Sequence, residues 1–244
     1  MEKVKGYHGE WNMGSPGGWD YQRIAQILGK MAWDLIRENV EMDVDLDFDS
    51  LFCKGTIQLS GQYSTMTRGP YYSGERNFNI SSKYHHKIWN IEGKTTQQSE
   101  ISNQQQVSPY LCEINCNYDV GNRISAANES YAINLSEMFV HILPKSSDKH
   151  RFLNYYSDFQ GQDVIKYVFR FKRPVRLENE ILFFNIDNDY ASYEFKLQQL
   201  DPLNVEIIST LKIFSELVSS TDYTDVEDII KAVNKRNILK IEAL

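Results

Sequence analysis

The chain has 244 residues, a net charge of −7, and a composition that is 41% hydrophobic and 24% charged, which excludes disorder along its whole length. Its aromatic content of 13%, with 15 tyrosines and 12 phenylalanines, favours β-strands, where flat side chains pack well. The acidic balance makes non-specific attraction to nucleic acid or anionic lipid unfavourable, and no run of residues approaches the ~18 apolar positions of a membrane helix.

The chain opens with a glycine-rich, aromatic stretch, residues 1–19, which indicates a short strand followed by an irregular turn. A helix over residues 20–39 is then predicted, with Asp20 as its N-cap. Its apolar stripe follows the i, i+3, i+4, i+7 and i+11 spacing and consists of Ile24, Ile27, Leu28, Met31 and Leu35.

From Met42 the apolar period changes to two residues. Val44, Leu46 and Phe48 alternate with four aspartates, Asp43, Asp45, Asp47 and Asp49, and a second alternating strand runs from Leu51 to Tyr63. Shorter strands are predicted at 77–82 and 86–91, followed by a polar loop over 92–108 that is long enough to be mobile or functional. Clean alternation of this kind favours antiparallel sheets with one wet face.

Three later segments continue the alternation. In residues 110–118 the even positions form the face expected to be dry, which places Cys112 and Cys116 in the core as small apolar residues. Ile165 to Lys172 predicts a strand that Pro174 stops. Ile181 to Ile186 and a return strand through Tyr193, Phe195 and Leu197 predict a hairpin.

Beyond Leu200 the pattern favours helices. Asp201 and Pro202 suit a helix start, and the stripe Ile207, Leu211, Phe214 and Val218 fits one face. Thr224 and Glu227 form a capping box for a second helix, before a short apolar terminal strand from 238 to 244. The predicted fold is mainly β (α+β), an antiparallel β-sandwich or partly closed barrel: residues 1–200 form the core domain, including the early helix, and residues 201–244 form a helical appendage.

Two charged runs stand out. The aspartates at 43, 45 and 47 are most simply explained as a solvated or edge-protecting strand face, and a divalent-metal site or a site for a basic partner is the weaker alternative. Lys166, Arg170, Lys172, Arg173 and Arg176 form a basic run that is typical of a solvated strand.

Glu194 and Lys196, with Glu178 or Asp187 upstream, resemble the core of the PD-(D/E)xK nucleases over about twenty residues. The resemblance implies a Mg²⁺ site in which two carboxylates hold the metal and the lysine orients a water. The typical Pro-Asp dipeptide of that family is absent, and Glu-x-Lys also arises on the wet face of any amphipathic strand.

No other segment carries a diagnostic catalytic or cofactor motif. We therefore expect a non-enzymatic module without a cofactor that binds a protein partner or a small-molecule ligand, with a structural subunit of a larger assembly as a further alternative. Exposed aromatics beside adaptable polar residues make good contact surfaces, so the expected contact residues are Trp11, Trp19, Tyr21, Tyr71 and Tyr72. Three cysteines, too few for a disulfide framework, predict a cytoplasmic location.

Overall fold

The computed structural model describes residues 2–6, 9–13, 34–61, 64, 94–102, 111–136, 141, 143, 153–157 and 160–244. The chain divides into two units, residues 1–33 and residues 34–244. The first contains an antiparallel hairpin of β1 (Glu2–Gly6) and β2 (Gly9–Met13), in which Val4 lies opposite Trp11. The strand predicted in this region is thus present as a pair.

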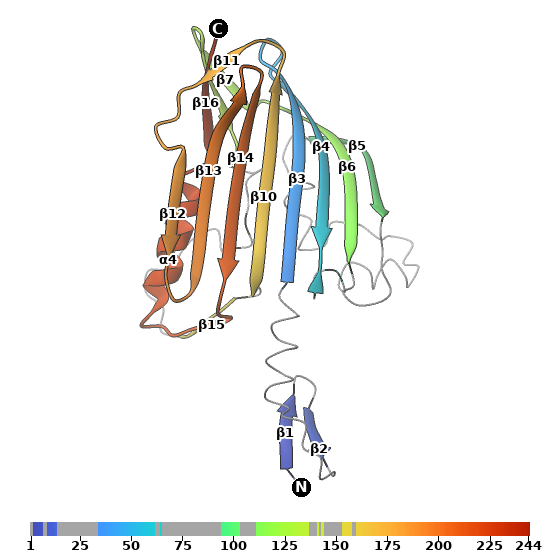
Figure 1. Cartoon of the computed structure of the whole chain (residues 1–244), viewed down its shortest axis with the longest axis vertical. Coiled ribbons are helices and arrows are strands. Elements are labelled where there is room, and N and C mark those ends of the chain that lie inside the picture. Colours follow the sequence, from blue (N-terminus) through green and yellow to red (C-terminus); the bar gives the residue numbers. More distant parts are fainter. Residues whose placement is uncertain are drawn as a thin grey trace. The chain divides into compact units, whose positions relative to one another are not determined.

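The second unit is built on an eight-stranded sheet with the order β12-β13-β14-β10-β3-β4-β6-β5 (Figure 1). Its strands are β3 (Asp34–Asp45), β4 (Ser50–Leu59), β5 (Lys94–Ser102), β6 (Cys112–Gly121), β10 (Gly161–Phe171), β12 (Phe183–Asp187), β13 (Ala191–Asp201) and β14 (Asn204–Ile213). Every neighbouring pair in this sheet is antiparallel except β10 and β3, which run parallel.

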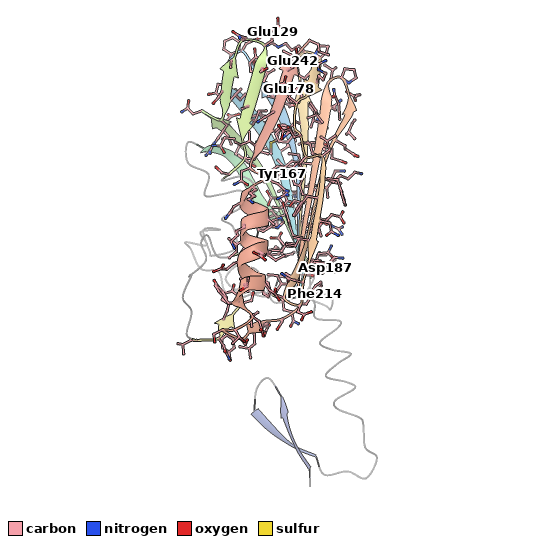
Figure 2. The ribbon with its side chains drawn as sticks, turned by 90° about the vertical axis from the view of Figure 1, so that its left-hand side faces the viewer. Glu129, Tyr167, Glu178, Asp187, Phe214 and Glu242 are labelled. Carbon is pink, nitrogen blue, oxygen red and sulfur yellow. The ribbon has the colours of Figure 1, made fainter. Side chains whose placement is uncertain are left out.

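A second, antiparallel sheet has the order β11-β16-β8-β7. Its strands are β7 (Ile124–Ala127), β8 (Ser130–Asn134), β11 (Val175–Leu177) and β16 (Ile238–Ala243), and a separate short pair joins β9 (Tyr155–Tyr156) to β15 (Leu217–Val218). Helix α4 (Tyr223–Asn234) precedes β16. Figure 2 shows α4 and the four-stranded sheet on the same side of the eight-stranded sheet.

The core lies between these layers. Alternate residues of the large sheet face α4 and the small sheet and are buried, as in β13, where Tyr193, Phe195 and Leu197 are at most 4% exposed. The opposite, outer face carries the intervening polar residues, including Glu194 and Lys196, which are exposed. The alternation predicted for 51–59, 165–171 and 193–197 is therefore confirmed, as is a mainly β, largely antiparallel fold. In 112–118 it is confirmed for the described side chains, which do not include that of Cys116.

The helix predicted over residues 20–39 is wrong for residues 34–39. Residues 34–39 belong to β3, whose inner face continues through Ile36, Val40 and Met42 with a period of two. The residue that interrupts this apolar series is Glu38, which is itself fully buried on the same face. Because a charged residue occupies a core position, the apolar period of two that marks a strand could not be recognised in this segment. The rest of the predicted helix, residues 20–33, lies outside the described residues.

The first C-terminal helix is also wrong. Residues 204–213 form β14, between β13 and β10 in the large sheet, and residues 217–218 form β15. The inner face of β14 reads Ile207, Ser209, Leu211 and Ile213, so a serine again interrupts the apolar period. The second helix is confirmed as α4, although its N-cap is Asp222, without a side-chain cap bond, rather than Thr224. The terminal strand is confirmed as β16.

The polar segment predicted as a loop over 92–108 contains strand β5 at the edge of the large sheet. Its sequence, Lys-Thr-Thr-Gln-Gln-Ser-Glu-Ile-Ser, shows little apolar alternation. Backbone pairing with β6, rather than side-chain hydrophobicity, defines it as a strand. The strands predicted at 77–82 and 86–91 lie outside the described residues.

Candidate functional sites

The acidic and basic runs singled out in the sequence lie beside each other. The parallel register of β10 and β3 places Arg170 opposite Asp43 and Phe171 opposite Val44. The amino group of Lys172 bonds to the Asp45 carboxylate, Arg170 lies 2.7 Å from Glu41, and Arg173 lies 3.5 Å from Asp47. The hydrogen bond from Lys172 lowers the pKa of Asp45. Asp45 and Asp47 therefore have basic partners within the chain itself, Lys172 and Arg173, which directly follow β10.

The four aspartates do not form one strand ladder, because β3 ends at Asp45. Asp47 lies in the following turn, where its N–H donates to Asp45 Oδ1 at 3.1 Å. Asp49 adopts a left-handed conformation (φ 46°) and accepts hydrogen bonds from the N–H groups of Arg123 and Ile124. Among the described residues no group of three or more His, Cys, Asp or Glu side chains is placed to hold a metal ion.

The nuclease-like residues are only partly brought together. Asn185 lies opposite Glu194 and Phe183 lies opposite Lys196, so Asp187 is a diagonal neighbour of Glu194 on the outer face. Glu178 follows β11, its N–H bonded to the Lys240 carbonyl at 3.0 Å, and Figure 2 shows it at the opposite end of the second unit from Asp187. Glu178 therefore does not share a site with the other residues.

Of the predicted aromatic contact residues, Trp11 lies in β2, opposite Val4. Trp19, Tyr21, Tyr71 and Tyr72 lie outside the described residues. The contact surface that they were expected to form is thus still a prediction.

A polar chain that the sequence did not reveal lies on the inner face of the large sheet. His141 Nδ1 is 3.1 Å from Asp163 Oδ2, and His141 Nε2 is 2.7 Å from Ser209 Oγ. Ser209 Oγ also donates to the Tyr193 hydroxyl at 3.3 Å, and the Tyr193 ring packs edge-on against the imidazole. The order acid, histidine, serine is that of a nucleophile and its base.

The three polar residues Asp163, His141 and Ser209 are not accessible to a substrate in this structure. Asp163 and Ser209 are 0% exposed and His141 is 3% exposed. Ser209 sits in the middle of β14, opposite Ile165 on β10 and Phe195 on β13. An acyl substrate would have to reach Ser209 Oγ to be attacked. We therefore assign these three residues a structural role, in which they provide hydrogen-bond partners inside the core and hold His141 against the sheet.

A second buried pair lies close by on the same face. The Tyr167 hydroxyl donates to Glu38 Oε1 at 2.8 Å, and both residues are fully buried. Burial first, and then the charge of Glu38, raise the pKa of Tyr167 well above its usual value. Burial also raises the pKa of Tyr193 to about 12. The neutral phenols are thus the stable forms in the folded protein.

The outer face of the sheet carries a shallow hollow of about 360 Å³. It spans β10, β3, β4 and β6, and its polar lining residues are Asn39, Glu41, Lys54, Thr56, Asn115, Asn117 and Lys166. They lie in two adjacent cross-strand rows: Lys166, Asn39, Thr56 and Asn115 form one, and Glu41, Lys54 and Asn117 belong to the other.

Several polar groups in this hollow face solvent with their bonding capacity unused. Within the described part of the chain, no hydrogen bond or ion pair engages the side chains of Asn39, Lys54 or Asn117. Lys54 lies opposite Glu41, but Glu41 pairs with Arg170 instead. Lys166 is paired with Glu206 at 2.5 Å. Three polar groups in a fixed sheet are therefore available to a ligand, and single-strand patterns gave no sign of them because the hollow is assembled across four strands.

Comparison with known proteins adds little. The sequence matches no known family profile, and no curated protein sequence matches it. Among solved structures, the acetylcholine-binding protein of Bulinus truncatus aligns over 80% of this chain and 98% of that chain, with 9% identity and a TM-score of 0.16. A TM-score this low supports no conclusion about fold or function. No helix among the described residues is long and apolar enough to cross a membrane.

Proposed function

We propose that the protein is a non-enzymatic binding module, built as two packed β layers, whose outer sheet face takes an acidic side chain of a protein partner in the hollow around Lys54. The observation that carries this proposal is the free ammonium group of Lys54, flanked by the amides of Asn39 and Asn117. An ammonium with two neighbouring amide donors suits a carboxylate, because charge-assisted hydrogen bonds are the strong ones.

The openness of the hollow favours a protein partner over a small metabolite. Small-molecule sites are mostly enclosed and apolar, with a few polar groups that set orientation. Here seven of the ten lining residues have polar side chains, the floor is a sheet, and the surrounding outer face is a broad mixed-charge surface. Such a surface is typical of a polar, water-accessible interface. The reduced cysteines Cys53 and Cys112 support a cytoplasmic location as part of the same proposal.

The test is a titration of the ¹⁵N-labelled protein with the N′-methylamide of N-acetylglutamate, whose only charge is its side-chain carboxylate, with the N′-methylamide of N-acetylglutamine as the neutral control. The side-chain amide signals of Asn39 and Asn117 should shift with the carboxylate probe and stay in place with the amide. Lys54→Gln should remove the response. Lys196→Gln, which changes another exposed lysine on the same sheet face but outside the hollow, should leave the response unchanged.

A hexaglutamate peptide separates the two sources of a carboxylate. If the hollow serves a protein partner, the peptide should bind about tenfold tighter than the single amino acid, because neighbouring carboxylates reach the adjoining face. Equal affinity per carboxylate would indicate a small-molecule site. Absence of any shift, or shifts that persist in Lys54→Gln, would refute the proposal.

A further inference from the structure

Glu41 lies between two cations on the outer face of the large sheet. The antiparallel register of β3 and β4 sets it directly opposite Lys54. The parallel register of β3 and β10 sets it opposite Val168, and Arg170, two residues further along β10, is its diagonal neighbour. Figure 1 shows these three strands side by side. A long side chain at position 41 therefore reaches a cation on either neighbouring strand.

The carboxylate of Glu41 pairs with the diagonal cation. Its Oε1 lies 2.7 Å from Arg170 Nη2, and both side chains are about half exposed. Within the described part of the chain no hydrogen bond or ion pair engages the ammonium of Lys54. Directly opposite residues of an antiparallel pair have Cβ atoms only about 4.5–5.5 Å apart, whereas diagonal neighbours are further away. Glu41 is thus paired with the more distant of its two cations.

The chemistry of the two cations explains this preference. The guanidinium of arginine is planar and more weakly hydrated than the ammonium of lysine, so it loses less hydration when it pairs with a carboxylate. Exposed ion pairs are weak, and the two possible pairings of Glu41 are therefore close in free energy. Loss of the guanidinium at position 170 is enough to move the Glu41 carboxylate to Lys54.

We propose that Arg170 is a positioning residue for the hollow around Lys54. It holds Glu41 away from Lys54 and so keeps the Lys54 ammonium open to the carboxylate of a partner. This inference rests on the proposed function. Glu41 lines the hollow beside Lys54 and carries the same chemical group as the acidic side chain of the partner. It is therefore an internal competitor for Lys54, and the ion pair with Arg170 removes that competition.

Arg170 acts on the site through Glu41 and not by contact with the partner. It is not one of the residues that line the hollow, whose lining residues on β10 are Lys166 and Val168. The effect of Arg170 on binding should therefore disappear when Glu41 is replaced. A cation that attracted the partner directly would keep its effect in either background.

The test is a double-variant cycle, read by NMR titration of the ¹⁵N-labelled full chain with the hexaglutamate peptide. Arg170→Gln should weaken binding by about fivefold, the upper end for an exposed ion pair, because Glu41 then pairs with Lys54. Glu41→Gln alone should bind somewhat more tightly than the wild type, since the competing carboxylate is gone. The double variant Arg170→Gln with Glu41→Gln should bind like Glu41→Gln alone.

Glu194→Gln supplies the control for net charge. Glu194 is an exposed glutamate on the same sheet face, on β13 and outside the hollow. Combined with Arg170→Gln, it removes the same charge as Glu41→Gln does, but binding should stay weakened because the competitor for Lys54 is still present. Circular dichroism confirms that each variant is folded.

The outcomes separate this inference from the proposed function. If no protein binds the peptide, the wild type included, both are overturned. If the wild type binds and Arg170→Gln binds equally well, only the positioning role of Arg170 is overturned. The same holds if the loss caused by Arg170→Gln persists in the Glu41→Gln background, or if Glu194→Gln restores binding as fully as Glu41→Gln.

Discussion

The buried chain of Asp163, His141 and Ser209 should be a large contributor to stability although it performs no chemistry. Ser209→Ala leaves His141 Nε2 without the partner it has at 2.7 Å, inside a core where Ser209 is 0% exposed. An unsatisfied buried polar group costs about 1–3 kcal/mol. Asp163→Asn removes the charge beside His141 Nδ1 while keeping the side-chain shape, and losing a hydrogen bond to a charged group costs about 1.5–3 kcal/mol.

Urea unfolding followed by circular dichroism measures both changes against a total stability of about 5–15 kcal/mol for a folded domain. Thr210→Ala, on the outer face of the same strand beside Ser209, is the matched control and should cost less than about 1 kcal/mol. The double variant Asp163→Asn with Ser209→Ala should be less destabilised than the sum of the two singles, because both act through His141. A cost below about 0.5 kcal/mol for Ser209→Ala, or strict additivity, would refute the reasoning.

Three other predictions concern the same core. A fluorophosphonate probe should not label Ser209 in the native protein, and mass spectrometry showing a modified Ser209 would contradict its structural assignment. Cys53 and Cys112, at 0% and 1% exposed, should react with a thiol reagent only as fast as the protein unfolds; rapid labelling of either would place it outside the core. The pKa of Tyr193 is about 12 in the folded protein and 10.0 in a free tyrosine. The stabilisation that comes from the neutral Tyr193 side chain is therefore complete below pH 10 and is lost between pH 10 and 12, at about 1.4 kcal/mol of unfolding free energy per pH unit. Tyr193→Phe should therefore reduce the slope of unfolding free energy against pH in that window, and an unchanged slope would show that Tyr193 ionises in the folded state.

Local pattern alone determined the parts of strands that have an uninterrupted apolar face, which in β10 is the part after the buried Asp163. In β10 and β13 every second side chain around Tyr167 and Tyr193 is aromatic or aliphatic, and the period of two is visible without any knowledge of neighbours. Helix α4 was equally legible, because Val226, Ile229, Ile230 and Val233 recur at helical spacing and are buried on one face. In these segments the solvent-facing residues are polar and the core-facing residues are apolar, so the local sequence is enough to predict the helix or strand.

Two of the strands that were predicted wrongly, β3 and β14, share a physical cause. Glu38 in β3 and Ser209 in β14 are polar residues at core positions, and each breaks the apolar period that would have marked its strand. Polar groups are tolerated in a core only when hydrogen-bonded, and the partners come from far along the chain: Tyr167 is 129 residues from Glu38, and His141 is 68 residues from Ser209. No local window contains both members of such a pair.

On the surface, too, the sequence determined the types of residue, and the tertiary structure decided how they are paired. The sequence identified an acidic run near Asp45 and a basic run near Lys172, but the parallel pairing of β3 with β10 decided that these runs neutralise each other. It likewise took three adjacent strands, β3, β4 and β6, to bring Asn39, Lys54 and Asn117 into one hollow, and a strand order that ends at β12 among the described strands to leave Phe183 at the edge of the sheet. Residue types and local periods determined which segments become strands with a dry face; strand order and register, which depend on long-range pairing, decided which polar groups are paired and which are left available for binding.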